Sequence, residues 1–285
     1  MKTVVVPCVL ALAASVLAGC GQDDEDGFTV ATASYPLAWM VERLAGDDAA
    51  VVDVVRPGVE PHDAELTVGE TAELTEAGLV VYERGLSPAV DEVADDLDAD
   101  ARVEVSDAVD RIGDDPHFWL DPRRLEAAAA LVAERLAEAD PDHADDYEAR
   151  LAKLSRDLDA LDSEFVTGLE DCARRTVVVS HEAFDYLGDR YNLDMEAVNG
   201  LTPESEPSPN HLVELRDLAE REGVTTVFSE RLASPELAET LADELGLEVA
   251  VLDPVEGLSE ETDDEDYLSL MRDNLAALRK ANDCS

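Results

Sequence analysis

The chain has 285 residues, enough for two lobes with cores of their own, and 46% of them are hydrophobic, which argues against a disordered chain. Acidic residues outnumber basic ones 68 to 21, giving a formal charge of −47. A surface of that sign repels polyanions, so nucleic acid is excluded as a partner. Because the acidic residues are scattered along the whole chain, we interpret them as an adaptation for solubility, such as life in high salt, rather than as a cation-collecting site.

The first 19 residues have the pattern of an export signal. Lys2 supplies the positive charge, and the apolar stretch Val4–Val16 is too short to span a bilayer. The following Leu17-Ala-Gly-Cys20 resembles the bacterial lipobox, in which the cysteine receives a lipid and becomes the first residue of the mature protein. We therefore predict a signal peptide at 1–19, lipidation at Cys20 and a polar tether at 20–27. The mature protein is expected to be exported and held by its lipid at the outer face of the cell membrane or in the periplasm.

Two cysteines remain once the signal peptide and the lipidated residue are set aside. Cys8 leaves with the signal, so Cys172 and Cys284 are the only pair left for an oxidising compartment. We predict a disulfide between them, which would tie the C-terminus to the middle of the chain. The alternative is two free thiols.

The segment 28–140 is predicted to form an N-terminal α/β lobe. Short apolar stretches read as strands and alternate with helical patterns, which favours parallel pairing of the strands. The predicted strands are 28–33, 51–55 and 79–82, and the predicted helices are 37–44 and 71–77.

A long helix is predicted next, over 141–171. Seven apolar residues recur there at spacings of three and four, which gives one apolar stripe along about 45 Å of helix. They are Tyr147, Leu151, Leu154, Leu158, Leu161, Phe165 and Leu169. A coiled coil is the alternative, but the heptads are few, and a helix that joins two lobes fits better.

The β/α alternation restarts after this helix, and we predict a C-terminal α/β lobe over 172–285. Its predicted strands are 176–180, 224–228 and 248–252, and its predicted helices are 183–191, 212–222, 235–245 and 267–281. The predicted fold is thus α/β, with two lobes that each contain a parallel-rich sheet flanked by helices and that are joined by one long backbone helix.

Three of the five histidines lie at positions that suit a ligand site. His62 follows a strand and a Pro-Gly turn, His117 lies in a loop, and His181 directly follows the strand 176–180. Asp253 also follows a strand, and ligands gather beyond the carboxyl ends of strands in α/β sheets. Imidazole and carboxylate are good ligands for borderline divalent metals. The other two histidines, His143 and His211, begin helices and are expected to be exposed to solvent.

Five motifs follow one another over nearly the whole mature chain. They are Pro57-Gly-Val-Glu-Pro-His62-Asp, Asp115-Pro-His117-Phe-Trp-Leu-Asp-Pro, Ser180-His181-Glu-Ala-Phe-Asp-Tyr-Leu, Gly200-Leu-Thr-Pro-Glu-Ser-Glu-Pro-Ser and Leu252-Asp253-Pro. In their order and spacing the chain resembles a known family, the solute-binding lipoproteins of zinc and manganese ABC importers.

The resemblance implies a metal site in the cleft between the lobes, with His62, His117, His181 and Asp253 as ligands. It also implies a non-enzymatic, monomeric receptor that delivers zinc to an ABC-type permease. The chain departs from many zinc-specific relatives in that 107–115 contains no histidine, whereas they carry a histidine-rich loop before the second ligand. Glu60 is a weaker ligand candidate because Pro61 separates it from His62, and Glu230 is a candidate to orient a ligand imidazole.

The sequence also allows three alternative functions. A manganese receptor of the same family stays open, although a histidine at position 181 favours zinc and manganese prefers oxygen ligands. A metal-dependent surface adhesin would have the same fold and site. A zinc hydrolase is disfavoured, because the metalloprotease motif needs a second histidine four residues after His181, where the chain has Asp185. A fourth protein ligand would also close the site to catalysis.

Overall fold

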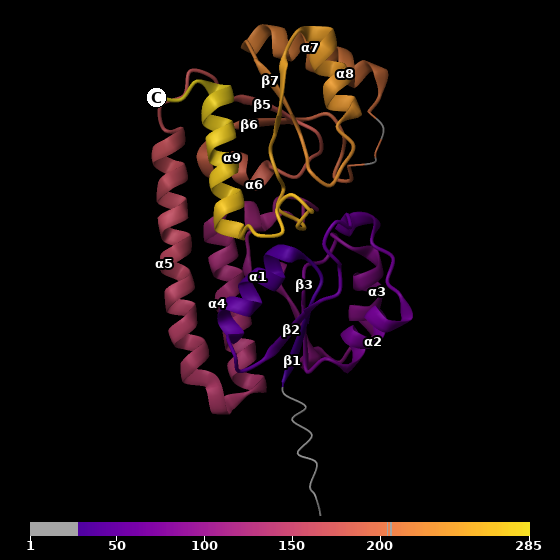
Figure 1. The fold of residues 1–285 in the computed structure, drawn as a ribbon, viewed down its shortest axis with the longest axis vertical. Coiled ribbons are helices and arrows are strands. Elements are labelled where there is room, and N and C mark those ends of the chain that lie inside the picture. The colour runs from indigo at the N-terminus through magenta and orange to yellow at the C-terminus, as the bar shows by residue number, and fades with distance from the viewer. Residues whose placement is uncertain (1–27, 204, 206) are drawn as a thin grey trace, which may run out of the picture.

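The structure is a computed structural model, and it describes residues 28–203, 205 and 207–285. The predicted signal peptide, Cys20 and the tether lie outside these residues. Figure 1 shows two lobes, one above the other, with a long helix along one side. None of the helices in the described ranges is long and apolar enough to cross a membrane.

The N-terminal lobe is built on a four-stranded parallel sheet of order β2-β1-β3-β4. Its strands are β1 (Thr29–Thr32), β2 (Ala50–Asp53), β3 (Leu79–Tyr82) and β4 (Arg102–Glu104). Its helices are α1 (Tyr35–Ala45), α2 (Val68–Glu76), α3 (Pro88–Asp96) and α4 (Pro122–Ala139). The central strand β3 is buried along its whole length, as expected for a strand covered by helices on both faces.

The C-terminal lobe repeats this plan with a parallel sheet of order β6-β5-β7-β8. Its strands are β5 (Thr176–Val179), β6 (Asp194–Ala197), β7 (Thr226–Ser229) and β8 (Glu248–Val251). Its helices are α6 (Asp185–Tyr191), α7 (Pro209–Glu222), α8 (Glu236–Leu245) and α9 (Tyr267–Asn282). The predicted fold class of two helix-flanked parallel sheets is confirmed, although the sequence did not predict β4, β6, α3 or α4.

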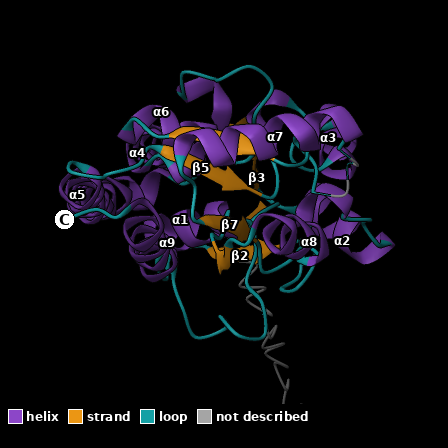
Figure 2. Cartoon of the chain, turned by 90° about the horizontal axis from the view of Figure 1, so that it is seen from above, coloured by secondary structure: helices purple, strands orange, loops and turns teal. Residues whose placement is uncertain are grey.

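The helix between the lobes is α5 (Ala144–Leu169), which begins three residues later than predicted, after a 3₁₀ turn at Pro141–His143, and ends two residues earlier. Six of the seven stripe residues are buried and Leu151 is half-buried, so the stripe packs on neighbouring helices instead of forming a coiled coil. Figures 1 and 2 both show α9 beside α5 on the same flank of the molecule. A disulfide between Cys172 and Cys284 joins the end of α9 to the segment after α5.

Candidate metal centre

The carboxyl ends of the strands carry the side chains that face the gap between the lobes. His181 comes two residues after β5, Glu230 directly follows β7, and Glu256 lies in the loop after β8. The N-terminal lobe supplies His62 from a 3₁₀ turn (Pro61–Asp63) and His117 from the residue before another, Phe118–Leu120. Each side chain is therefore placed by a short turn anchored to a rigid sheet or helix.

Three imidazoles and one carboxylate converge on one point between the lobes. His62, His117, His181 and Glu256 each offer one donor atom, and these atoms all lie within 4.8 Å of one another. The Nε2 atoms of His62 and His117 are 3.2 Å apart. Glu256 Oε1 lies 3.0 Å from Nε2 of His117, 3.4 Å from that of His181 and 3.9 Å from that of His62.

These separations suit a tetrahedral zinc ion. Zinc bonds of about 2.0 to 2.1 Å imply about 3.3 to 3.4 Å between neighbouring donor atoms. The four side chains are almost completely buried, since none of the four residues is more than 8% exposed. Within the described part of the chain, neither carboxylate oxygen of Glu256 nor Nε2 of His181 makes a well-directed hydrogen bond, although ion-pair contacts join them to each other and join Glu256 to His117. Buried polar atoms without partners are costly, so the arrangement fits a cation that would satisfy them.

Two further carboxylates hold the imidazoles in position. Nδ1 of His117 lies 2.6 Å from Asp115 Oδ1, and Nδ1 of His181 lies 2.6 Å from Glu230 Oε1. An ionised carboxylate has no hydrogen to donate and can only accept a hydrogen bond. Each Nδ1 is therefore the donor, and each Nε2 faces the centre. The orienting role predicted for Glu230 has this geometry. The corresponding role of Asp115 was not predicted, although its position two residues before His117 was visible in the motif.

In the metal-free site, burial and the neighbouring charged groups shift the pKa values in opposite directions. Burial lowers the pKa of His62 to about 4. Burial also disfavours charge on His181, but the carboxylates of Glu230 and Glu256 outweigh it and raise that pKa to about 10. Burial likewise opposes the ionised form of Glu256, yet His117 and His181 hold its pKa well below the usual range. Without metal, the site is thus a buried cluster of imidazolium and carboxylate groups.

Glu60 adds a second carboxyl group beside Glu256. Burial and the nearby Glu256 carboxylate raise the pKa of Glu60 to about 9, so Glu60 carries a proton at neutral pH. Its Oε1 accepts a hydrogen bond from the His62 backbone N–H at 3.2 Å, which steadies the turn that presents His62. Glu60 is not among the four residues whose donor atoms converge.

Glu256 stands in the convergent group, whereas Asp253, the predicted fourth ligand, does not. Both carboxylate oxygens of Asp253 are used elsewhere: Oδ2 lies 3.0 Å from Arg231 Nε, and Oδ1 accepts a hydrogen bond from the Val255 N–H. The loop turns after Asp253, and the longer side chain three residues later reaches the imidazoles. The sequence run Leu252-Asp-Pro-Val-Glu-Gly257 contained both acidic residues, but nothing in it ranked one above the other.

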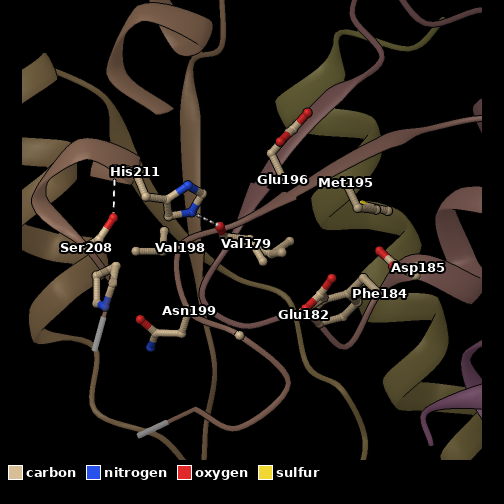
Figure 3. Close-up of a pocket in the computed structure, with 13 residues that line it drawn as sticks. Val179, Glu182, Phe184, Asp185, Met195, Glu196, Val198, Asn199, Ser208 and His211 are labelled. Atoms are coloured by element: carbon tan, nitrogen blue, oxygen red, sulfur yellow. Dashed lines mark hydrogen bonds between the residues drawn. The ribbon is translucent and has the colours of Figure 1, made fainter. Parts of the chain in front are cut away.

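A separate pocket of about 480 Å³ lies beside β5 and β6, and Figure 3 shows the side chains around it. Glu182, which follows His181 in sequence, forms part of its wall together with Asp185 and His211. His211 is half-buried, not solvent-exposed as predicted, and its Nε2 donates to the Ala197 carbonyl at 2.8 Å. His143 is also half-buried, with Nδ1 2.7 Å from Asp140. Neither histidine takes part in the convergent group.

Comparison with known proteins agrees with the geometry of the centre. Residues 30–281 match the family model described as zinc-uptake complex component A, periplasmic (ZnuA). The chain belongs to the ZnuA family. The resemblance to zinc-uptake receptors noted from the sequence is thereby confirmed.

The similar proteins are bacterial zinc-binding proteins and adhesins. The chain is 31% identical to the zinc-binding lipoprotein AdcA of Streptococcus pneumoniae, covering 95% of this chain and 60% of that protein. It is 28% identical to the high-affinity zinc uptake system protein ZnuA of Bacillus subtilis, covering 97% of this chain and 95% of that protein.

Solved structures share the fold. The zinc-bound ZnuA-like domain of the S. pneumoniae AdcA superposes with a TM-score of 0.79 at 31% identity, over 90% of this chain and 99% of that chain. The laminin-binding protein Lmb of Streptococcus agalactiae, described as a bifunctional adhesin and metal transporter, superposes with a TM-score of 0.81 at 31% identity, over the same shares of the two chains.

Proposed function

We propose that this ZnuA-family protein is a zinc receptor that captures the ion outside the cytoplasm and delivers it to an ABC-type import permease. The observation that carries the proposal is the convergence of His62, His117, His181 and Glu256 on one buried point between the lobes. Three nitrogen donors and one oxygen donor suit zinc, whereas manganese prefers more oxygen ligands and a higher coordination number. Zinc is the cargo here, and the ABC permease is the partner.

The same ligand set argues for a receptor without catalysis. Hydrolytic zinc sites keep one coordination position for water and have three protein ligands. Here four buried protein donors surround the point, so they would fill a tetrahedron. The lobes are also tied across their interface, since the Tyr186 hydroxyl accepts from the Ile112 N–H and donates to the Asp115 carbonyl, both at 3.0 Å. Release of the ion would then proceed through local loop shifts on contact with the permease, rather than through wide opening of the lobes.

The attachment and location of the receptor belong to the same proposal. The lipobox-like run ending at Cys20 supports a lipid anchor, and the pneumococcal and other relatives are named as lipoproteins or zinc-uptake proteins. We propose a monomer held by this lipid on the outer face of the membrane or in the periplasm. The chain spans 60% of the length of AdcA, and this proposal does not include functions of the rest of AdcA.

Metal analysis followed by competition titration tests the zinc assignment. The mature protein is purified without added metal, its bound metal is measured, and the metal-free form is titrated with zinc and manganese against a chelator of known affinity. Zinc should bind with one site and displace manganese. Copper binding would be uninformative, because copper(II) binds most nitrogen and oxygen sites more tightly than zinc.

The variants His181→Ala and His143→Ala give a matched pair. His181→Ala removes a direct ligand and should lower zinc affinity by orders of magnitude, whereas His143→Ala should leave it unchanged. A preference for manganese at equal free metal, or equal zinc affinity in the two variants, would contradict the proposal.

An adhesin function is a second candidate, favoured by the structural similarity to the laminin-binding protein of S. agalactiae. Binding of the metal-free and zinc-loaded protein to immobilised laminin separates the two roles. Saturable binding that depends on zinc would support an additional adhesin function, and no binding above that of an unrelated acidic protein would exclude it.

A further inference from the structure

We propose that Asp253 is a positioning residue, which holds the Glu256 carboxylate at the metal point by fixing the turn between them and so sets the affinity for zinc. This inference rests on the proposed zinc site. Asp253 is not one of the four converging residues, and its two oxygens are engaged by Arg231 and by the Val255 N–H.

The turn has an unusual backbone. Val255 has φ of +59°, a left-handed conformation that branched side chains rarely adopt. The Val255 N–H donates to Asp253 Oδ1 at 2.8 Å, so the aspartate side chain closes the turn over the strained residue. The chain direction after Val255 depends on this conformation, and Glu256 is the next residue.

The start of the turn is fixed by groups from both lobes. Asn274 of α9 accepts from the Asp253 N–H at 2.8 Å and donates to the Asp253 carbonyl at 2.6 Å. The indole N–H of Trp119 donates to the Pro254 carbonyl at 2.7 Å, and the Tyr35 N–H donates to the Glu256 carbonyl at 3.1 Å. The backbone from 253 to 256 is therefore held at nearly every residue.

The Glu256 side chain, in contrast, is held only by groups of the site itself. Its Oε1 lies 3.0 to 3.9 Å from the Nε2 atoms of the three histidines, and the Glu60 carboxyl group lies beside it. The turn, the imidazoles and Glu60 together keep the carboxylate in place. If the turn relaxes, Glu256 loses its position and zinc is left with three imidazoles. Asp253 thus acts on the metal through Val255 and Glu256.

The test compares Asp253→Ala, Asp253→Asn and Glu256→Gln with the control Asp243→Ala, which changes an exposed aspartate of the same lobe. The full mature chain is titrated with zinc, and the visible spectrum of the cobalt(II)-substituted protein reports the number and geometry of ligands. Asp253→Ala should weaken zinc binding about 10- to 100-fold, as is typical for groups that orient ligands. It should also shift the cobalt spectrum toward that of Glu256→Gln. Asp253→Asn keeps an oxygen for the Val255 N–H and should recover part of both properties.

The outcomes separate this inference from the zinc proposal. If Glu256→Gln binds zinc like the unchanged protein, the fourth ligand of the proposed site is wrong. If Glu256→Gln is weakened but Asp253→Ala keeps the original affinity and cobalt spectrum, the positioning role is wrong and the site stands. Melting of the zinc-free variants checks folding. Should Asp253→Ala fail to fold, Asp253→Asn decides, because an affinity and spectrum identical to those of the unchanged protein would overturn the inference.

Discussion

Zinc binding should release protons, and Glu230 should control how many. In the metal-free protein the pKa of His181 is about 10, because the Glu230 and Glu256 carboxylates outweigh the effect of burial. At pH 7 its proton must be displaced before Nε2 can bind zinc. The difference of about three units between this pKa and pH 7 corresponds to about 4 kcal/mol. Zinc should therefore bind about a thousandfold more weakly than it would if His181 were already deprotonated. His62, with a pKa of about 4, releases none.

The expected pH dependence follows from this count. The pKa of His117 is also raised, since Asp115 and Glu256 outweigh the effect of its burial, so zinc displaces a second proton wherever His117 is still charged. The dissociation constant should therefore fall about tenfold per pH unit for each proton released, between pH 6 and 9. The free energy of unfolding of the zinc-free protein should change in the opposite sense to the affinity and fall as the pH rises. The folded pKa of His181 lies above its ordinary 6.5, so its stabilising contribution is complete below pH 6.5 and is lost as the pH rises toward 10.

Calorimetric titration at pH 7 in buffers with different heats of ionisation counts the protons directly. Glu230→Gln removes the carboxylate beside Nδ1, so it should lower the pKa of His181 and reduce both the proton count and the slope with pH. Glu236→Gln, at an exposed position, should leave both unchanged. The reasoning is refuted if the unchanged protein releases no protons at pH 7, or if Glu230→Gln releases as many as Glu236→Gln.

Three other predictions concern the rest of the chain. Mass spectrometry of the membrane fraction should find a diacylated N-terminus at Cys20, and a soluble mature protein that begins elsewhere would contradict this. Cys172→Ser should lower the free energy of unfolding by about 4 to 5 kcal/mol in denaturant titrations, because the disulfide closes a loop of 112 residues; thiol titration of the unreduced, unfolded protein should find neither Cys172 nor Cys284 free. With a charge of −47, melting temperatures at about 0.01 M and 1 M salt should differ clearly, since the Debye length falls from about 30 to 3 Å; equal melting temperatures would remove self-repulsion as a factor.

The fold could be predicted where local patterns are strong. The stripe along α5 and the apolar strands β3 and β5 have periodicities that survive without tertiary context. The strand β4 has three residues, and β6 reads Asp-Met-Glu-Ala at the edge of its sheet, so neither has an apolar run long enough to recognise. Their place is decided by pairing with β3 and β5, which is information that the local sequence does not contain.

The candidate site could also be predicted only in part from the sequence. His62, His117 and His181 stand out because histidine is rare in the chain and each follows a strand or lies in a turn. The sequence pointed to Asp253 as the fourth donor, whereas the convergent group contains Glu256 from the same loop. Choosing Glu256 over Asp253 depends on the left-handed Val255 and on the engagement of Asp253 by Arg231, and both are properties of the folded backbone. The orienting contact from Asp115 likewise appears only when its side chain is seen against His117.

The most direct test of the zinc site is a crystal structure of the zinc-loaded protein with anomalous diffraction recorded on both sides of the zinc absorption edge. One strong peak is predicted between the lobes, with Nε2 of His62, His117 and His181 at about 2.0 to 2.1 Å and a Glu256 oxygen at about 2.0 to 2.2 Å. Asp253 should remain paired with Arg231. A peak bound through Asp253 without Glu256, or zinc held only by residues outside this group, would contradict the account.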